Sequence, residues 1–461
     1  MNNTDNLGIL RMPALIRKMA VPASVGFLVM NIYFIADSIF IGKYVGAMGI
    51  AAISVVMPIT FLISSIGMAI GVGGSSLISR FLGAENELEA NKTFGNMTAL
   101  TGVLSVIIMG SAYFFMDKIL VAFGAQGNIF PHAKEYFNNL ILGIPFLAWS
   151  MMSNNAMRAE GAPKKAMMIM VISALVNLVF DPIFIIALGL GMKGAAYATV
   201  LGYFSSAIYS FFFFLKGDST LLFHRKYLQL KWTYIKDIFS IGSVTLARQG
   251  TVSLLSIVLN HSLFLYGTEV AVAAYGIISR VLMFSNFPVL GITQGFLPIA
   301  GFNYGAKKYD RVMSSIKLSI IYGSIIASSI FIFVLLFPTT ITSIFIGPED
   351  GDILEMTPGA MIIVFGATPL ITAQLIGSAY FQAIGKAMPA LLLTLTKQGF
   401  FLIPFILILP LKFDLAGIWY AFPISDILAT LVTIIFLRKA IFKLKKEKQT
   451  APQAVSADKM T

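Results

Sequence analysis

Residues 30–42 read MNIYFIADSIFIG, a stretch in which one carboxylate, Asp37, lies among apolar side chains. The apolar run around it extends from about residue 14 to residue 41, which is longer than a core helix of a soluble protein needs. A charged side chain at bilayer depth is costly and is usually retained because it has a function. The stretch therefore predicts a membrane-spanning helix that carries part of an ion or substrate site.

The composition excludes a soluble globular protein. Of 461 residues, 57% are hydrophobic and 12% are charged, which leaves too little polar surface to cover a soluble fold of this size. The apolar runs lack the alternating pattern of barrel strands. We therefore predict an all-α integral membrane protein with twelve transmembrane helices, near residues 14–41, 48–78, 94–116, 136–157, 165–188, 194–215, 238–265, 270–300, 314–337, 356–382, 388–410 and 416–437.

The distribution of Lys and Arg predicts the orientation of these spans. Most of the 33 basic residues fall in loops on the side that holds both termini, whereas the other side has only Lys43, Lys118, Lys134, Lys193 and Lys412. Cytoplasmic loops carry such an excess, so we expect both termini to be cytoplasmic. Because these charges are spread over many loops as membrane anchors, the net charge of +12 does not indicate nucleic-acid binding.

The two halves of the chain resemble each other. Four short motifs recur in the same order at offsets of 222 to 224 residues: Gly67-x3-Gly71 with Gly291-x3-Gly295, Gly83-Ala84 with Gly305-Ala306, Ala159-Glu160-Gly161 with Ala383-Ile384-Gly385, and GAAYA at 194–198 with GIWYA at 417–421. Since each half has six spans, we predict two pseudo-symmetric six-helix lobes around a central cleft. The predicted boundaries are 1–215 for the N-lobe, 216–236 for a cytoplasmic linker, 237–440 for the C-lobe and 441–461 for a basic, disordered tail.

Polar residues in the N-lobe spans fall at one depth. Asp37, Asp181 and Thr199 each lie about 6 to 11 Å from the outer end of their span, at 1.5 Å per residue. Asn177 and Tyr33 stand four residues before Asp181 and Asp37, and so share a helix face with them. With no His or Cys in this layer, the oxygen-rich set suits sodium at Asp37, Asn177, Asp181 and Thr199, or two carboxylic acids that exchange protons. Alternatively, these polar side chains serve only to hold the helices together by hydrogen bonds. The C-lobe counterparts are apolar, so a packing role common to both lobes does not account for the acids.

Two prolines lie in the same spans. Pro22 in span 1 and Pro182 directly after Asp181 each remove a backbone hydrogen bond and favour a kink. A bendable span 1 would couple protonation of Asp37 to helix shape.

These features together resemble the multidrug and toxic compound extrusion (MATE) family, over about residues 10–443. The resemblance rests on the twelve spans, the span 1 pattern from Pro22 to Asp37, NLVFDP at 177–182, GAAYAT at 194–199 and RAEGAPKKAM at 158–167. Within this family the chain is similar to the DinF-like branch, whose acidic site lies in the N-lobe. The resemblance implies cation-coupled antiport, with Asp37, Asn177, Asp181 and Thr199 as the cation site and Pro22 as the bending proline.

Polar residues in the C-lobe leave two interpretations open. In one, Asp426 neutralises one of the cations Arg248, Arg280 and Lys397, and the others lie near span ends or face water. In the other, the cations line the cleft, where they bind anionic groups or repel a cationic drug during release. His261, near the outer end of span 7, is either an interfacial side chain or a proton relay.

Two functional hypotheses follow. The first is a multidrug antiporter of the cell membrane that exports small lipophilic, often cationic compounds against inward proton or sodium flow. The second is a flippase for lipid-linked saccharides, a related fold whose basic cleft holds a pyrophosphate; the acidic N-lobe argues against it. The sequence contains no hydrolase, kinase or metalloprotease motif, so we expect no enzyme activity and no cofactor besides the coupling ion. We expect a monomer whose partners are its substrates and membrane lipids.

Overall fold

The computed structural model describes residues 4–216, 219–346 and 351–450, and every regular element in these ranges is a helix. The first half contains α1 (Asp5–Ile9), α2 (Met12–Tyr44), α3 (Ala47–Gly83), α4 (Glu87–Phe114), α5 (Met116–Ala122), α6 (Ile129–Leu140), η1 (Ile141–Gly143), α7 (Ile144–Ala159), α8 (Pro163–Asp181), η2 (Pro182–Ala187) and α9 (Gly191–Leu215). The second half contains η3 (Arg225–Tyr227), α10 (Trp232–Gly305), α11 (Tyr309–Leu336), α12 (Pro338–Ser343), α13 (Gly351–Phe365), α14 (Thr368–Ala383), α15 (Ala387–Leu395), η4 (Thr396–Leu402), α16 (Ile403–Ile408) and α17 (Pro410–Thr450).

These helices provide the twelve predicted spans. Nine helices in the described ranges are long and apolar enough to cross a membrane, and α13 with α14, bent by 45°, makes a tenth crossing. The 74 residues of α10 are too long for one crossing, and the chain reverses at Thr268, where φ is +59°, so α10 supplies two. The continuous run from α6 through α7 is the remaining span. Large apolar side chains such as Phe114 and Leu411 lie exposed on the outside, as expected of a surface that faces lipid.

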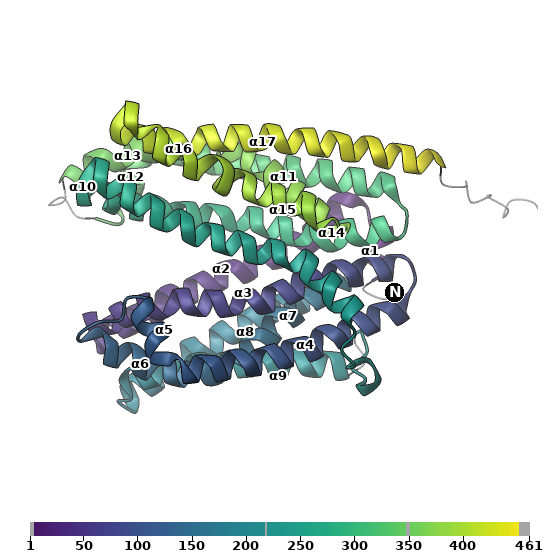
Figure 1. The fold of residues 1–461 in the computed structure, drawn as a ribbon, viewed down its shortest axis with the longest axis horizontal. Helices are drawn as coiled ribbons and strands as arrows, with labels where there is room; N and C mark the ends of the chain where they lie inside the picture. The colour runs from purple at the N-terminus through teal and green to yellow at the C-terminus, as the bar shows by residue number, and fades with distance from the viewer. Residues whose placement is uncertain (1–3, 217–218, 347–350, 451–461) are drawn as a thin grey trace, which may run out of the picture.

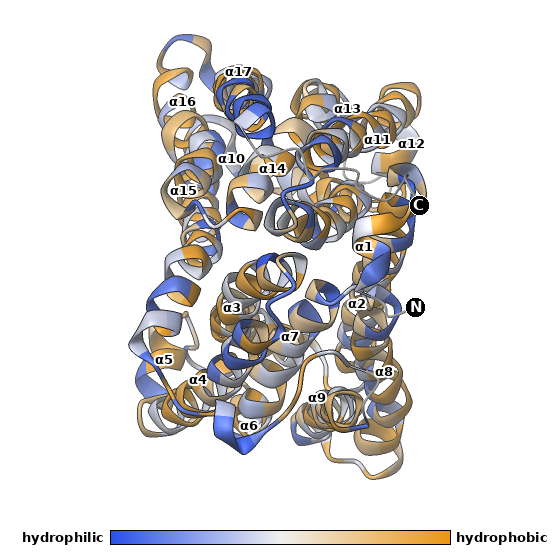
Figure 2. Ribbon diagram, turned by 90° about the vertical axis from the view of Figure 1, so that its right-hand side faces the viewer, coloured by the Kyte–Doolittle hydropathy of each residue, from blue (hydrophilic) through white to orange (hydrophobic). Residues whose placement is uncertain are grey.

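The helices form two groups that diverge from one end. Figure 1 shows α2–α9, the N-lobe, and α10–α17, the C-lobe, meeting where α1 lies and separating toward the opposite end. Viewed from the end that holds α1, the two lobes form separate rows of predominantly hydrophobic helices (Figure 2). We call the end with α1 and residues 219–231 the linker end, and the opposite one the far end.

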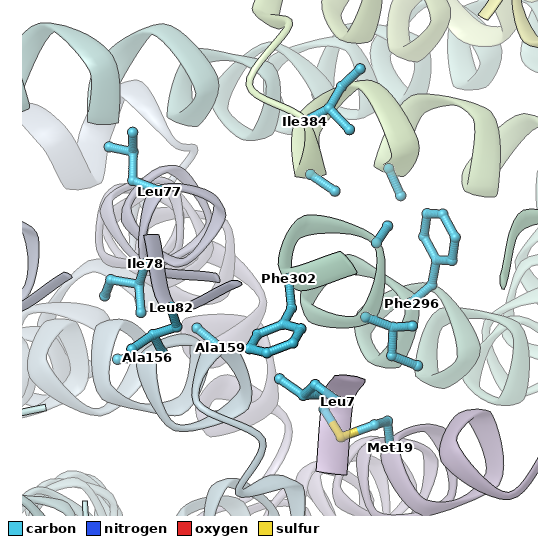
Figure 3. Close-up of a cluster of buried hydrophobic side chains, with 14 of the residues drawn as sticks. Leu7, Met19, Leu77, Ile78, Leu82, Ala156, Ala159, Phe296, Phe302 and Ile384 are labelled. Atoms are coloured by element: carbon cyan, nitrogen blue, oxygen red, sulfur yellow. The ribbon is translucent and has the colours of Figure 1, made fainter. Parts of the chain in front are cut away.

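Apolar packing follows the same division. One buried cluster at the linker end contains residues of both lobes, and in it the ring of Phe302 from the C-lobe is directed at Ala159 of the N-lobe (Figure 3). Two further clusters each belong to one lobe alone, around Phe137 in the N-lobe and around Phe365 in the C-lobe. Among the described residues, the buried apolar cluster shared by the two lobes is therefore the one at the linker end, where it excludes water between them.

The sequence repeat corresponds to a structural repeat at this joint. Gly83 lies against the backbone of Phe302 and Gly305 lies against the backbone of Arg80, so a Cβ at either glycine would overlap main-chain atoms of the other lobe. The turns after α7 and α14 also match, since Gly161 has φ +83° and Gly385 has φ +79°. Glycine adopts this left-handed conformation without the steric cost of a side chain. The glycines that recur in sequence thus serve equivalent positions in the two lobes.

One predicted boundary differs from the structure. We predicted a disordered tail from residue 441, but α17 continues to Thr450. Residues 443–448 are rich in Lys, Leu and Glu, which favour helix, and Lys443 Nζ lies 3.8 Å from Glu447 Oε1, one turn away. Lys448 also pairs with Asp310 of α11 at 2.7 Å. Residues 451–461 lie outside the described residues.

Candidate cation site and C-lobe cavity

Three N-lobe helices bring the predicted acidic residues together. Asp37 comes from α2, Asn177 and Asp181 from one face of α8, and Thr199 from α9, and none of these side chains is more than 5% exposed. At 1.5 Å per residue, Asp37 lies about 10 Å from the end of α2 and Thr199 about 12 Å from the start of α9, both at the far end. Asp181 lies about 9 Å from the end of η2, which continues α8. The depth and the shared face predicted for this layer therefore correspond to a buried cluster in the interior of the N-lobe.

The cluster contains more acceptor oxygens than hydrogen-bond donors. Asn177 Nδ2 donates to Thr199 Oγ1 at 3.2 Å, and the carboxyl groups of Asp37 and Asp181 are near enough to interact with each other. Asp37 Oδ1, Asn177 Oδ1 and both carboxyl oxygens of Asp181 have no hydrogen-bond partner among the described residues. Buried polar atoms are normally paired, so these unpaired oxygens can accept a proton or bind a cation.

Three tyrosines surround the two acids. Tyr33, predicted from its position one turn before Asp37, is buried beside it, and Tyr136 and Tyr203 are within electrostatic reach of Asp37 as well. Sequence reasoning missed the last two. The sequence held a signal for Tyr203, because this residue follows Thr199 by four positions and so shares its helix face. The sequence held no such signal for Tyr136, since no pattern relates α6 to α2.

The two prolines occupy different settings. Pro182 follows Asp181 directly and begins η2, a π-helical segment, so Asp181 stands at the junction of two helix types. Such π-segments are frequent at functional sites. Pro22 lies fifteen residues before Asp37, about 22 Å along the axis, within a helix that is continuous from Met12 to Tyr44. It does not contact the cluster, so any influence on Asp37 would act through α2 itself.

The C-lobe residues divide into two groups. Arg248, Lys397 and Asp426 line one cavity of about 370 Å³. Lys397 Nζ lies 2.6 Å from Asp426 Oδ1, and Gln374 Nε2 donates to the same carboxylate at 3.3 Å. Arg280 and His261 are exposed on the surface and are not among the described residues that line this cavity. Asp426 thus neutralises Lys397, as one of the two interpretations expected, whereas Arg248 faces the cavity, as the other expected.

The described ranges hold no group of three or more His, Cys, Asp or Glu side chains suited to a transition metal. The N-lobe cluster instead offers carboxylate, carboxamide and hydroxyl oxygens, which are ligands for a hard cation such as sodium. The same two neighbouring carboxyls also suit proton exchange, because like charges at short distance are not both ionised without cost.

Comparisons with known proteins extend over most of the chain. The MatE family model matches residues 22–183 and 246–408. The chain is 27% identical over 421 residues to the multidrug export protein MepA of Staphylococcus aureus (strain MSSA476), covering 91% of this chain and 92% of that protein. It is 26% identical to MepA of Staphylococcus haemolyticus (strain JCSC1435), with coverage of 88% and 89%.

Solved structures are similar along nearly the full length. A crystal structure of a MATE protein in complex with MaL6 gives a TM-score of 0.92 at 26% identity, covering 97% of this chain and 100% of that one. An outward-facing multidrug resistance MATE transporter of the MOP superfamily gives a TM-score of 0.91 at 26% identity, covering 97% and 99%.

Proposed function

We propose that this chain, which belongs to the MATE family of membrane transporters, exports lipophilic, often cationic organic compounds in exchange for protons or sodium ions that move inward. The observation that carries the proposal is the buried N-lobe cluster, whose unpaired oxygens belong to Asp37, Asn177 and Asp181. The similarity to MepA, a multidrug export protein, supports multidrug compounds as the substrates. An acidic site in the N-lobe also supports assignment to the DinF-like branch.

The chemistry of coupling follows from the two neighbouring carboxyl groups. When Asp37 and Asp181 are both ionised, their repulsion and burial favour uptake of a proton or a sodium ion, to which Thr199 and Asn177 contribute further oxygens. A filled site and an empty site then interact differently with the surrounding helices. Binding of the ion shifts the equilibrium between two lobe arrangements by that difference in affinity, and substrate that prefers the other arrangement is exchanged for it.

The proposal includes an orientation in the cell membrane. The excess of Lys and Arg in loops at the linker end supports a cytoplasmic location for that end and for both termini. The lobes separate toward the far end (Figure 1), so this arrangement would be open to the outside. The N-lobe cluster lies nearer the far end and would receive its ion from there.

The flippase alternative requires a group of cations that holds a pyrophosphate. Arg280 is on the surface and Lys397 is bound by Asp426, so Arg248 alone would serve that purpose among the three cations considered. This arrangement disfavours the flippase.

The proposal is tested in proteoliposomes that contain the purified protein. Transport of ethidium and tetraphenylphosphonium is measured with a proton gradient and a sodium gradient imposed separately. We expect one of the gradients to drive transport and Asp37→Asn to abolish the gradient-driven part while the protein remains folded. Asp117→Asn is the matched control, because Asp117 is exposed and pairs with Lys134 at the surface. Gradient-driven transport by Asp37→Asn at the normal rate would refute the proposed coupling site.

A further inference from the structure

The C-lobe cavity has a different chemistry from the N-lobe cluster. Its volume of about 370 Å³ is within the range of small-molecule sites in proteins. The lining comes entirely from C-lobe helices, including α10, α14, η4 and α17. No part of the acidic cluster borders it, so the cavity is a separate site.

The charges around the cavity do not cancel. Asp426 is 2% exposed and is satisfied by Lys397 at 2.6 Å and by Gln374, which donates to its backbone oxygen at 2.8 Å as well. Arg248 is partly buried, and its guanidinium has no hydrogen bond or ion pair within the described ranges. With Lys397 neutralised by Asp426, the cavity retains one positive charge.

A guanidinium in this setting selects its ligand. Removing it from water is costly unless an anion or several acceptors compensate, and its planar set of donors fits carboxylate, sulfonate or phosphate oxygens in a bidentate manner. Tyr275, Asn286 and Gln398 line the same cavity and supply further polar contacts. A cationic ligand would meet repulsion from Arg248 instead.

The remaining walls are apolar. Leu255, Leu282, Leu402 and Phe422 are among the residues that enclose the cavity. Such walls gain free energy by burying hydrocarbon, which an inorganic anion does not provide. We infer that the C-lobe cavity binds amphiphilic molecules that carry one anionic group, with the anion at Arg248 and the hydrocarbon part against these walls. This site goes beyond the proposed antiport, which uses a cation site in the other lobe.

Binding of a matched set of probes tests the inference. Isothermal titration calorimetry on the full-length protein in a non-ionic detergent compares naphthalene-2-sulfonate with the neutral naphthalene-2-carboxamide and with cationic (2-naphthylmethyl)trimethylammonium. We expect the sulfonate to bind at least about tenfold more tightly than the other two, since hydrogen bonds to charged groups are the stronger class. Equal affinity for all three probes would overturn the inference, and so would binding of chloride with no preference for the aromatic anion.

Variants identify the site. Arg248→Gln should weaken sulfonate binding about tenfold or more, and Arg248→Lys, which keeps the charge, should restore part of it. Arg280→Gln is the matched control, because Arg280 lies in the next span, is exposed and does not line the cavity, and this variant should bind as the unmodified chain does. Unchanged binding by Arg248→Gln would refute the site. Should Arg248→Gln fail to fold, Asp426→Asn provides a second test, since freeing Lys397 from its counter-ion should strengthen sulfonate binding.

The outcome is distinguishable from failure of the antiport proposal. Equilibrium binding requires no ion gradient, so it is measured separately from transport. Sulfonate binding without transport of cationic compounds would support this inference and refute the antiport proposal. Transport without sulfonate binding would support the antiport proposal and refute this inference.

Discussion

In the N-lobe, Asp37 and Asp181 lie buried with three of their carboxyl oxygens unpaired, whereas in the C-lobe Asp426 is bound by Lys397 and Gln374. The backbone packing of the two lobes is nevertheless equivalent, because Gly83 and Gly305 make matching contacts where the lobes meet. Similar helix packing thus accommodates a negative cluster in one lobe and a net positive cavity in the other. Packing symmetry places constraints on the glycines and leaves the charged positions free to differ.

The comparison extends to the helices that carry these charges. In each lobe the fifth span contains a π-helical segment, η2 directly after Asp181 and η4 around Lys397. A π-segment changes the direction in which successive side chains point, and it leaves weaker backbone pairing than an α-helix. The two lobes therefore present a charged side chain from corresponding spans, but with opposite sign.

The largest expected difference between the lobes is in transport. Asp181→Asn should reduce gradient-driven efflux of tetraphenylphosphonium to background, because one carboxyl alone lacks the coupling to a second. Asp426→Asn should retain dependence on the gradient and change the substrate preference toward anionic amphiphiles. Proteoliposome assays with the exposed acid Asp352→Asn as control measure both. Loss of gradient dependence in Asp426→Asn, with transport intact in Asp181→Asn, would reverse the roles of the lobes.

For stability, in contrast to transport, we expect the larger loss from a substitution in the C-lobe. Lys397→Met leaves the carboxylate of Asp426 buried without its counter-ion, and should lower the free energy of unfolding by about 3 kcal/mol. Asp181→Asn should leave stability unchanged or raise it, because it removes an unpaired buried carboxyl. Thermal unfolding in detergent compares the two variants.

The double variant Lys397→Met with Asp426→Leu serves as the control for this pair. It removes both charges together and should recover most of the loss, since an apolar replacement of a buried ion pair is often neutral. A single Lys397→Met protein as stable as the unmodified chain would show that the pair contributes nothing.

Much of the fold was predictable from the sequence because lipid imposes a simple rule on each span. The twelve apolar runs and the recurring glycines predicted the helices and the two lobes, and depth with four-residue spacing predicted the association of Asp37, Asn177 and Asp181. The roles of these residues stay a prediction.

What the sequence did not reveal depends on helix rotation and on contacts between distant spans. No sequence pattern shows that Asp426 pairs with Lys397 rather than with another cation, or that Arg280 and His261 lie on the surface. Hydropathy gives the depth of a residue but not the direction of its side chain. The same limitation hid Tyr136. The helical extension to Thr450 was missed because a charged run outside the bilayer was interpreted as disordered, although its composition favours helix.

The last expected effect concerns a position where the lobes differ outside the spans. Glu160 lies in the turn between α7 and α8, and its C-lobe counterpart in the repeat is Ile384. Glu160 Oε2 accepts hydrogen bonds from Ser219 Oγ at 2.7 Å and from the backbone N of Thr220 at 2.9 Å, which attaches the linker to the N-lobe. Burial raises the pKa of Glu160 from 4.5 to about 7, although these hydrogen bonds act in the opposite direction.

The sign of the pH dependence follows from that shift. The folded protein binds the Glu160 proton more tightly than the unfolded chain does, so this group favours folding below pH 4.5 and costs stability as the pH rises to about 7. Relative to Glu160→Gln, the unmodified chain should lose up to about 3 kcal/mol of stability between pH 4.5 and pH 8. Thermal unfolding across this range measures it, with Glu87→Gln as the control because Glu87 is exposed. Parallel curves for the unmodified chain and Glu160→Gln would mean that the Glu160 carboxyl is as well solvated in the fold as in the unfolded chain.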